Sequence, residues 1–333
     1  YSGLVSGDTF NGTYIGAFSD KNAGVGKTVT ITSSYSGADV SNYSVTDQSS
    51  TTANITAKSL TVSGITASDK TYDGGVTATM NGNSAVYSGL VSGDTFNGTY
   101  TGVFSNANVG SGKTVTITSS YAGADVNNYS VTDQSSTTAD ISTKTLTATA
   151  SASDKTYDGG TTASTTLTFT GLVGSETLGQ TVGSTFDNKN VGSNKTVTVN
   201  SITLGNGSNG GLAANYSISA GQTTTANITP KALTVSGITA SNRTYDGSTN
   251  VTLTGTAVYS GLVDGDTFDG TYTGAFSDKN VGTGKTVNIT SSYSGADVSN
   301  YSVTDQSTTT ANITAKSLTV SGITASSKTY DGS

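Results

Sequence analysis

The sequence predicts an all-β fold, with tandem Ig-like β-sandwich domains of about 86 residues arranged in an extended string. Three observations support this prediction. The 333-residue chain repeats itself with that period, its short apolar runs alternate with polar residues, and no stretch keeps a helical period. Apolar residues make up 32% of the chain and charged residues 11%, while 17 Tyr and 8 Phe are spread along it. Because disordered chains combine high net charge with few aromatics, this composition instead fits many small β units with thin cores.

The repeat is visible in two triplets and in a long self-alignment. Tyr-Asp-Gly begins at Tyr72, Tyr157, Tyr245 and Tyr330. Asn-Tyr-Ser begins at Asn42, Asn128, Asn215 and Asn300. Residues 1–68 align with residues 259–326 at an offset of 258, which is three periods of 86, with seven differences. The period therefore runs through the whole chain.

A period of this size indicates one small domain per repeat. Solenoid repeats run to only about 20–45 residues, whereas an Ig-like sandwich needs about 100 residues and seven short strands. The expected units are 1–57 (the C-terminal part of a repeat), 58–143, 144–230 (divergent), 231–315 and 316–333 (the N-terminal part of a repeat). No flexible spacer separates them, and the one proline, Pro230, stiffens a junction.

The second unit illustrates the expected strands. They are centred, in order, on residues 60–63, 70–72, 76–80, 96–100, 114–118, 129–131 and 141. Asp73-Gly74 is expected to turn the chain after the second of these strands. Asn97-Gly98, between Phe96 and Tyr100, is expected to form a two-residue hairpin turn, because this dipeptide accepts positive φ. Threonines between the apolar residues favour strands that have one solvent-exposed face.

The composition excludes several classes of function. The chain has no His and no Cys, so it lacks imidazole bases, thiolate nucleophiles and the usual zinc ligands. Glu176 is the only glutamate, and Arg243 is the only arginine beside 14 lysines. With a net charge of −7, a nucleic-acid partner is not expected. No apolar run approaches the ~20 residues of a membrane span. We expect no enzyme and no cofactor.

The motifs resemble a known family. Lys70-Thr71-Tyr72-Asp73-Gly74, Ser88–Asp94, Asn108–Val115 and Gly123–Tyr129 follow one another in an order that resembles the bacterial YDG repeat. That repeat is akin to MBG-type Ig-like modules, which occur in tandem in large secreted surface proteins such as filamentous-haemagglutinin-like adhesins. The third unit departs from the pattern, with Asn194 before Lys195 and Gly211-Leu212-Ala213-Ala214 before Asn215. The resemblance implies β-sandwich stalk modules outside a bacterial cell.

The repeated motifs are interpreted as structural. In Tyr-Asp-Gly we expect a buried tyrosine that ends a strand, followed by an Asp-Gly turn. In Asn-Tyr-Ser we expect a core tyrosine whose hydroxyl bonds a backbone group. The residues concerned are Tyr72, Asp73, Gly74, Tyr157, Asp158, Gly159, Tyr245, Asp246, Gly247, Asn128, Tyr129, Asn215, Tyr216, Asn300 and Tyr301. The alternative is a glycan-binding module in which each unit uses exposed Tyr and Asp side chains.

Two further patterns suggest ligands, and each has a structural explanation. Gly24–Thr28 ends like a phosphate loop, but Lys21 stands where that motif needs its first glycine and a strand follows instead of a helix. We therefore expect a glycine turn leading into a strand. Asp264 and Asp266 are the candidates for a calcium site, since carboxylates are calcium ligands. Solvated turn aspartates are the alternative.

These observations together predict a non-catalytic structural segment of an extracellular bacterial adhesin stalk or surface filament. Such a segment would be secreted to the cell surface or to a biofilm matrix. Its expected partners are other copies of itself in a fibre, or a host or neighbouring cell reached through domains outside this sequence. We expect no nucleic-acid partner and no membrane span.

The two incomplete units carry one more expectation. Tyr1 corresponds to Tyr87, and Ser333 falls at the phase of Gly75, so neither partial unit could bury a sandwich core alone. We expect the sequence to be a window of a longer fibre. The alternative is head-to-tail strand donation, in which residues 316–333 of one molecule complete residues 1–57 of the next.

Overall fold

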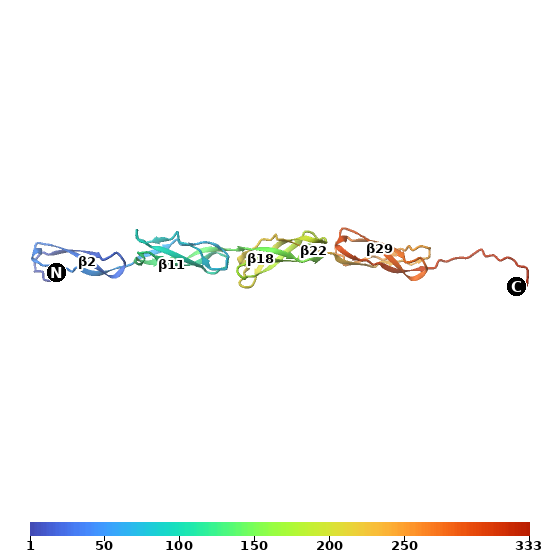
Figure 1. The fold of residues 1–333 in the computed structure, drawn as a ribbon, viewed down its shortest axis with the longest axis horizontal. Helices are drawn as coiled ribbons and strands as arrows, with labels where there is room; N and C mark the ends of the chain where they lie inside the picture. The colour runs from blue at the N-terminus through green and yellow to red at the C-terminus, as the bar shows by residue number, and fades with distance from the viewer. The chain divides into compact units, whose positions relative to one another are not determined.

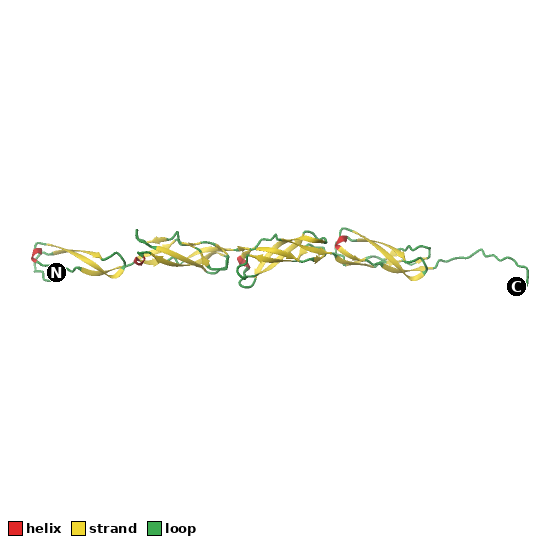
Figure 2. Ribbon diagram, in the orientation of Figure 1, coloured by secondary structure: helices red, strands yellow, loops and turns green.

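The computed structural model describes residues 1–333, and β-strands dominate it (Figures 1 and 2). The only helices are four three-residue 3-10 turns: η1 (Val40–Asn42), η2 (Val126–Asn128), η3 (Ala213–Asn215) and η4 (Val298–Asn300). None of the helices has the length and apolar character needed to cross a membrane. The all-β prediction is confirmed.

The chain forms two compact units, and residues of the third repeat belong to both. The first unit comprises Tyr1–Leu146, Gly171–Leu178 and Asn206–Ser217. Its strands are β1 (Asn11–Phe18), β2 (Gly24–Ser36), β3 (Ser50–Ile55), β4 (Lys58–Ser63), β5 (Thr66–Ala67), β6 (Lys70–Thr71), β7 (Thr77–Ala78), β8 (Met80–Asn81), β9 (Val86–Ser88), β10 (Asn97–Phe104), β11 (Gly110–Ala122), β12 (Tyr129–Thr132), β13 (Ser136–Ser142), β14 (Lys144–Thr145) and β21 (Tyr216–Ser217).

The second unit comprises Thr147–Thr170, Gly179–Gly205 and Ile218–Ser333. Its strands are β15 (Thr147–Ala152), β16 (Lys155–Thr156), β17 (Thr162–Ala163), β18 (Thr165–Thr170), β19 (Leu178–Phe186), β20 (Gly192–Asn206), β22 (Thr223–Thr229), β23 (Lys231–Ser236), β24 (Thr239–Ala240), β25 (Arg243–Thr244), β26 (Leu253–Thr254), β27 (Val258–Ser260), β28 (Asp269–Phe276), β29 (Gly282–Ser294), β30 (Tyr301–Thr304) and β31 (Thr308–Thr314). Leu178 in β19 and Asn206 in β20 are end residues that belong to the first unit.

The second repeat shows the sheet arrangement most completely. A five-stranded sheet has the order β6-β13-β11-β10-β7, and a three-stranded sheet has the order β12-β4-β9. In the smaller sheet β4 pairs in parallel with β12 and antiparallel with β9. The fourth repeat repeats this pattern, with the orders β25-β31-β29-β28 and β27-β23-β30. The first repeat has a single sheet, β1-β2-β3.

The core of the second repeat lies between its two larger sheets. Leu60 and Val62 in β4 are 0% and 2% exposed and pack in one cluster with Phe96 and Ile117. Thr61, between them in the sequence, is exposed. Buried and exposed residues thus alternate with a period of two, as expected for a strand that buries one face.

Two local predictions are wrong. Asn97-Gly98 does not form a hairpin turn, because both residues begin β10 and pair with Ala122 and Tyr121. Gly98 is required there for close packing, since a Cβ would collide with the hydroxyl groups of Tyr100 and Tyr87. The strand expected over residues 76–80 is divided into β7 and β8, which pair in different sheets.

The glycine turn leading into a strand is confirmed. β2 starts at Gly24, Gly26 has a φ of 64°, and the register shifts between Gly24 and Lys27 as in a β-bulge. The side-chain oxygen of Asn54 accepts a hydrogen bond from the Gly26 amide at 2.8 Å. The divergent third repeat keeps this turn, because Asn194 adopts a φ of 52° and asparagine tolerates the left-handed region.

Candidate functional site: the junctions between repeats

The Asp-Gly pair of each Tyr-Asp-Gly motif forms the expected turn. Asp158 accepts a hydrogen bond from the Gly160 amide at 2.8 Å and pairs with Lys155 at 2.7 Å, and Asp73 makes the same contacts with Gly75 and Lys70. In the fourth repeat Asp246 accepts from Ser248 and Arg243. The glycines that follow have φ values of 77° at Gly74, 80° at Gly159 and 88° at Gly247, a region that side chains disfavour.

The tyrosine of the motif contacts the next repeat. Tyr72 is 4% exposed and Tyr157 is 1% exposed, so the expected burial is found at both. The ring of Tyr72 packs edge-on against Tyr216 with centroids 5.4 Å apart, and Tyr157 packs against Tyr301 in the same way at 5.6 Å. Each aromatic pair joins the Tyr-Asp-Gly motif of one repeat to the Asn-Tyr-Ser motif of the following one.

One carboxylate receives both tyrosine hydroxyls at each of these junctions. Glu176 accepts from Tyr72 and Tyr216, each at 2.6 Å. Asp266 accepts from Tyr157 at 2.8 Å and from Tyr301 at 2.6 Å. Burial and the hydrogen bond to Glu176 raise the pKa of Tyr72 to about 12, so its hydroxyl stays protonated as a donor at neutral pH.

The asparagine of Asn-Tyr-Ser makes the contact that recurs at all three junctions. Its Oδ1 accepts a hydrogen bond from a backbone amide of the preceding repeat. The three pairs are Ala23 to Asn128 at 2.9 Å, Val109 to Asn215 at 3.0 Å and Val191 to Asn300 at 2.9 Å. Its Nδ2 donates to an asparagine of the preceding repeat, namely Asn22, Asn108 and Asn190 respectively. The 3-10 turns η2, η3 and η4 end at these residues and so fix their position.

The tyrosine of Asn-Tyr-Ser bonds the backbone as expected. The hydroxyl groups accept hydrogen bonds from Val91 at Tyr129 (3.0 Å), from Val173 at Tyr216 (2.9 Å) and from Val263 at Tyr301 (2.9 Å). Each hydroxyl also donates to the carboxylate of its own repeat, so it makes one bond as a donor and one as an acceptor.

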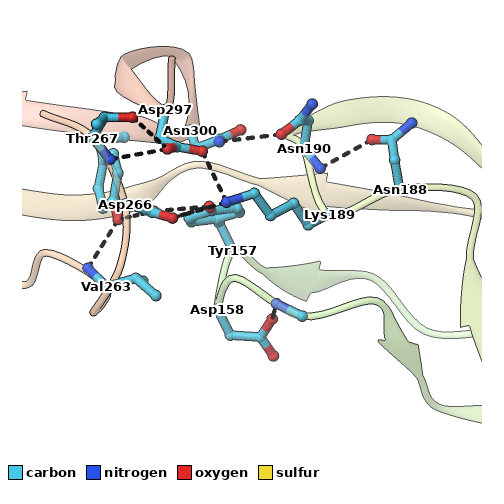
Figure 3. A network of polar contacts seen from close by, with 12 residues as sticks. Tyr157, Asp158, Asn188, Lys189, Asn190, Val263, Asp266, Thr267, Asp297 and Asn300 are labelled. Carbon is cyan, nitrogen blue, oxygen red and sulfur yellow. Dashed lines mark hydrogen bonds and ion pairs between the residues drawn. The ribbon is translucent and has the colours of Figure 1, made fainter. Parts of the chain in front are cut away.

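Two of the three junctions also contain a lysine. Lys189 lies 2.9 Å from both Asp266 and Asp297, whose side chains are 3% and 11% exposed (Figure 3). Lys21 is placed in the same way near Asp94 and Asp125, at 3.2 and 3.3 Å. Burial alone would raise the pKa of Asp266, but hydrogen bonds from Tyr301, Lys189 and Tyr157 outweigh it and lower that pKa below its usual value.

The middle junction replaces the lysine and one of its two aspartates together. Ala107 occupies the position of Lys21 and Lys189, and Leu212 occupies the position of Asp125 and Asp297. The carboxylate at position 212 is thus absent together with the lysine, while Glu176, at the position of Asp94 and Asp266, keeps two tyrosine donors. The same change can be read in the sequence when the repeats are compared position by position, and that comparison could have located the junction. The sequence-based predictions also assigned no contact between repeats to Lys21, Lys189, Asn22, Asn108 and Asn190.

The calcium candidates do not come together as a site. Asp266 is committed to Tyr157, Tyr301 and Lys189, while Asp264 is exposed. The structure contains no group of three or more acidic, histidine or cysteine side chains that could hold a metal ion. In the fourth repeat Tyr245 is half-buried, and no residue of a following repeat packs against it.

Comparison with known proteins identifies the repeat. The model of the YDG domain matches residues 1–53, 56–139, 142–226 and 229–311, which together make up most of the chain. No curated protein matches the chain. No solved structure matches it either.

Proposed function

Because the chain belongs to the YDG domain family, in four successive copies, we propose that it is a non-catalytic structural segment of an extracellular bacterial stalk or surface filament, such as that of an adhesin. The observation that carries the proposal is the asparagine contact at all three junctions. A partly buried polar contact of one kind at each junction is what a spacer under load needs to resist bending between neighbouring repeats.

The tyrosines support this proposal over glycan binding. A glycan-binding module would present exposed aromatic rings in every repeat, whereas Tyr72 and Tyr157 are 4% and 1% exposed and pack on the following repeat. The absence of His and Cys fits a passive spacer, because few groups respond to pH near neutrality or to redox state. On this proposal the segment is secreted and lies at the cell surface or in a matrix. It separates an anchor from whatever other domains contact a host or neighbouring cell.

The test is a height measurement on a cell surface. The 333-residue chain is placed between a membrane anchor and an epitope, and the height of the epitope above the membrane is measured by axial super-resolution imaging. The shortened variant lacks residues 58–230, so the first repeat is followed directly by the fourth. Lys21 can then pair with Asp266 and Asp297, which stand at the positions of Asp94 and Asp125, so the ion pair is preserved. We expect the height to fall in proportion to the two repeats removed. Equal heights for the two chains would contradict a spacer function.

A further inference from the structure

In the second and fourth repeats, the first and the last part of the repeat lie side by side and run in the same direction. In the second repeat these parts are residues 58–72, which we call the entering segment, and residues 129–142, which we call the leaving segment. β4 pairs in parallel with β12, and further along β6 pairs in parallel with β13. The two pairings belong to different sheets, so both segments pass from one sheet to the other.

Side chains connect the two segments between these pairings. The side-chain oxygen of Gln134 accepts from the Ile65 amide at 2.9 Å, and its amide nitrogen donates to the Ile65 carbonyl at 2.8 Å. The side chain of Asp69 accepts from the Asp140 amide at 2.7 Å. The entering and leaving segments are therefore bonded at intervals along most of their length.

The fourth repeat has the same arrangement. β23 pairs in parallel with β30, and β25 pairs in parallel with β31. Gln306 accepts from the Ile238 amide at 2.9 Å and donates to the Ile238 carbonyl at 2.6 Å. The third repeat has fewer of these bonds, because β14 pairs with β21 over two residues only and Gly221 stands at the position of Gln134.

We infer that the entering and leaving segments form a clamp that bears tension along the chain. Tension reaches the second repeat at Lys58, which lies opposite Tyr129 at one end of the paired segments. It leaves the repeat after Ser142, which lies opposite Thr71 at the other end. The pull therefore slides two parallel segments past each other and loads all the hydrogen bonds between them at once. If the segments were antiparallel, both points of pull would lie at one end and the bonds would open one by one.

This inference deepens the proposed function, since a stalk that holds a cell is pulled along its length. Resistance to such a pull depends on the rate of unfolding under load and not on equilibrium stability. A clamp at the two ends of a repeat raises that resistance directly, because the strands between the two segments in the sequence cannot be drawn out until it opens.

The test is force spectroscopy of the full chain in optical tweezers, with the second repeat pulled in two geometries. The chain has no cysteine, so DNA handles attach only at introduced ones. Lys58→Cys with Thr143→Cys pulls the clamp in shear. Lys58→Cys with Asn127→Cys pulls both segments at the same end and peels β4 from β12. All three positions are exposed. We expect a higher unfolding force in shear, with release of up to about 300 Å of extended chain.

Gln134→Ala provides the second measurement, because it removes two hydrogen bonds between the segments. At constant force it should speed unfolding about 10-fold or more in the shear geometry and change the rate little in the peeling geometry. Tyr100→Phe is the matched control, since the Tyr100 hydroxyl bonds that of Tyr87, and neither residue belongs to the clamp. The control should leave the unfolding rate in shear nearly unchanged.

Equal unfolding forces in the two geometries would overturn the inference. It would also be overturned if Gln134→Ala had the same effect on the rate in both geometries, because the two bonds would then stabilise the repeat without bearing load. A failure here leaves the height measurement on a cell surface unaffected, and equal heights there would leave the clamp unaffected, so the two proposals fail separately.

Discussion

Asp266 carries a negative charge although its side chain is only 3% exposed, because three donors surround it. Lys189 and Tyr157 come from the third repeat, and Tyr301 comes from the fourth. Hydrogen bonds to an ionised acceptor are stronger than those between neutral groups. Without Asp266 the hydroxyls of Tyr157 and Tyr301, residues that are 1% and 7% exposed, would lose their acceptor. The single carboxylate therefore couples the folding of one repeat to the docking of the next.

Truncation of Tyr157 should separate the contribution of its ring from that of its hydroxyl. Tyr157→Ala removes a ring that is 1% exposed and is expected to cost about 3–5 kcal/mol of unfolding free energy. Tyr157→Phe removes only the hydrogen bond to Asp266, which keeps two other donors, and should cost about 1 kcal/mol. Chemical denaturation of the full chain measures both. A stable Tyr157→Ala variant would mean that the ring contributes little to the junction.

The junction between the third and fourth repeats should be most stable between about pH 4 and pH 10. Because the pKa of Asp266 is lowered in the folded state, its contribution is present above the unfolded pKa of about 4 and is lost as pH falls through the folded value. Burial and the bond to Asp266 raise the pKa of Tyr301 to about 12. Its contribution is therefore complete below about pH 10 and is lost as pH rises through about 12.

Denaturation midpoints measured across this pH range test the assignment. Asp266→Asn should lower stability at neutral pH and make the loss of stability in acid shallower, because the titrating carboxylate is gone. An acid limb equally steep in the variant would show that Asp266 does not contribute to it.

At the scale of single elements, the start of β10 depends on one glycine. Gly98 lies under the hydroxyls of Tyr100 and Tyr87, which are 3.0 Å apart, and its amide donates to Tyr87 at 3.1 Å. Gly98→Ala should cost about 1–3 kcal/mol, since the rings must move or the strand must shift. The matched control is Gly110→Ala, where a Cβ would meet only the Lys113 side chain at 3.4 Å. Denaturation of both variants checks this, and equal stabilities would contradict the steric explanation.

The strands of the repeat could be predicted because their buried face follows the period of two, as Leu60 and Val62 show in β4. The role of Gly98 could not, because the same dipeptide that favours a hairpin turn also suits a strand on which two tyrosines pack from residues 87 and 100. The pattern of single residues carries no information about that tertiary contact. Burial of Tyr72 and Tyr157 was expected, but their partners were not, because each partner lies more than one hundred residues away in the next repeat.

At the scale of the whole molecule, the proposed spacer function depends on whether the junctions hold neighbouring repeats in one orientation. The asparagine pair is common to all three junctions, the tyrosine pair occurs at two, and the lysine with two aspartates also occurs at two. Ala107 and Leu212 distinguish the middle junction from its neighbours. The residue at the end of one repeat is therefore matched to the residue that it faces in the next repeat. A mismatch, such as Asp297 facing an alanine, would leave a largely buried charge without its cation.

The most direct test of this account is the distance distribution between the third and fourth repeats in solution. The chain has no cysteine, so spin labels on cysteines introduced at the exposed positions Thr168 and Thr273 can be measured by pulsed electron spin resonance without background. We predict one narrow distance for the native chain, a broadened distribution for Lys189→Ala, and no change for Lys279→Ala, whose lysine has no partner in the structure. A broad distribution in the native chain, or equal behaviour of the two lysine variants, would contradict the claim that these junctions fix the repeats.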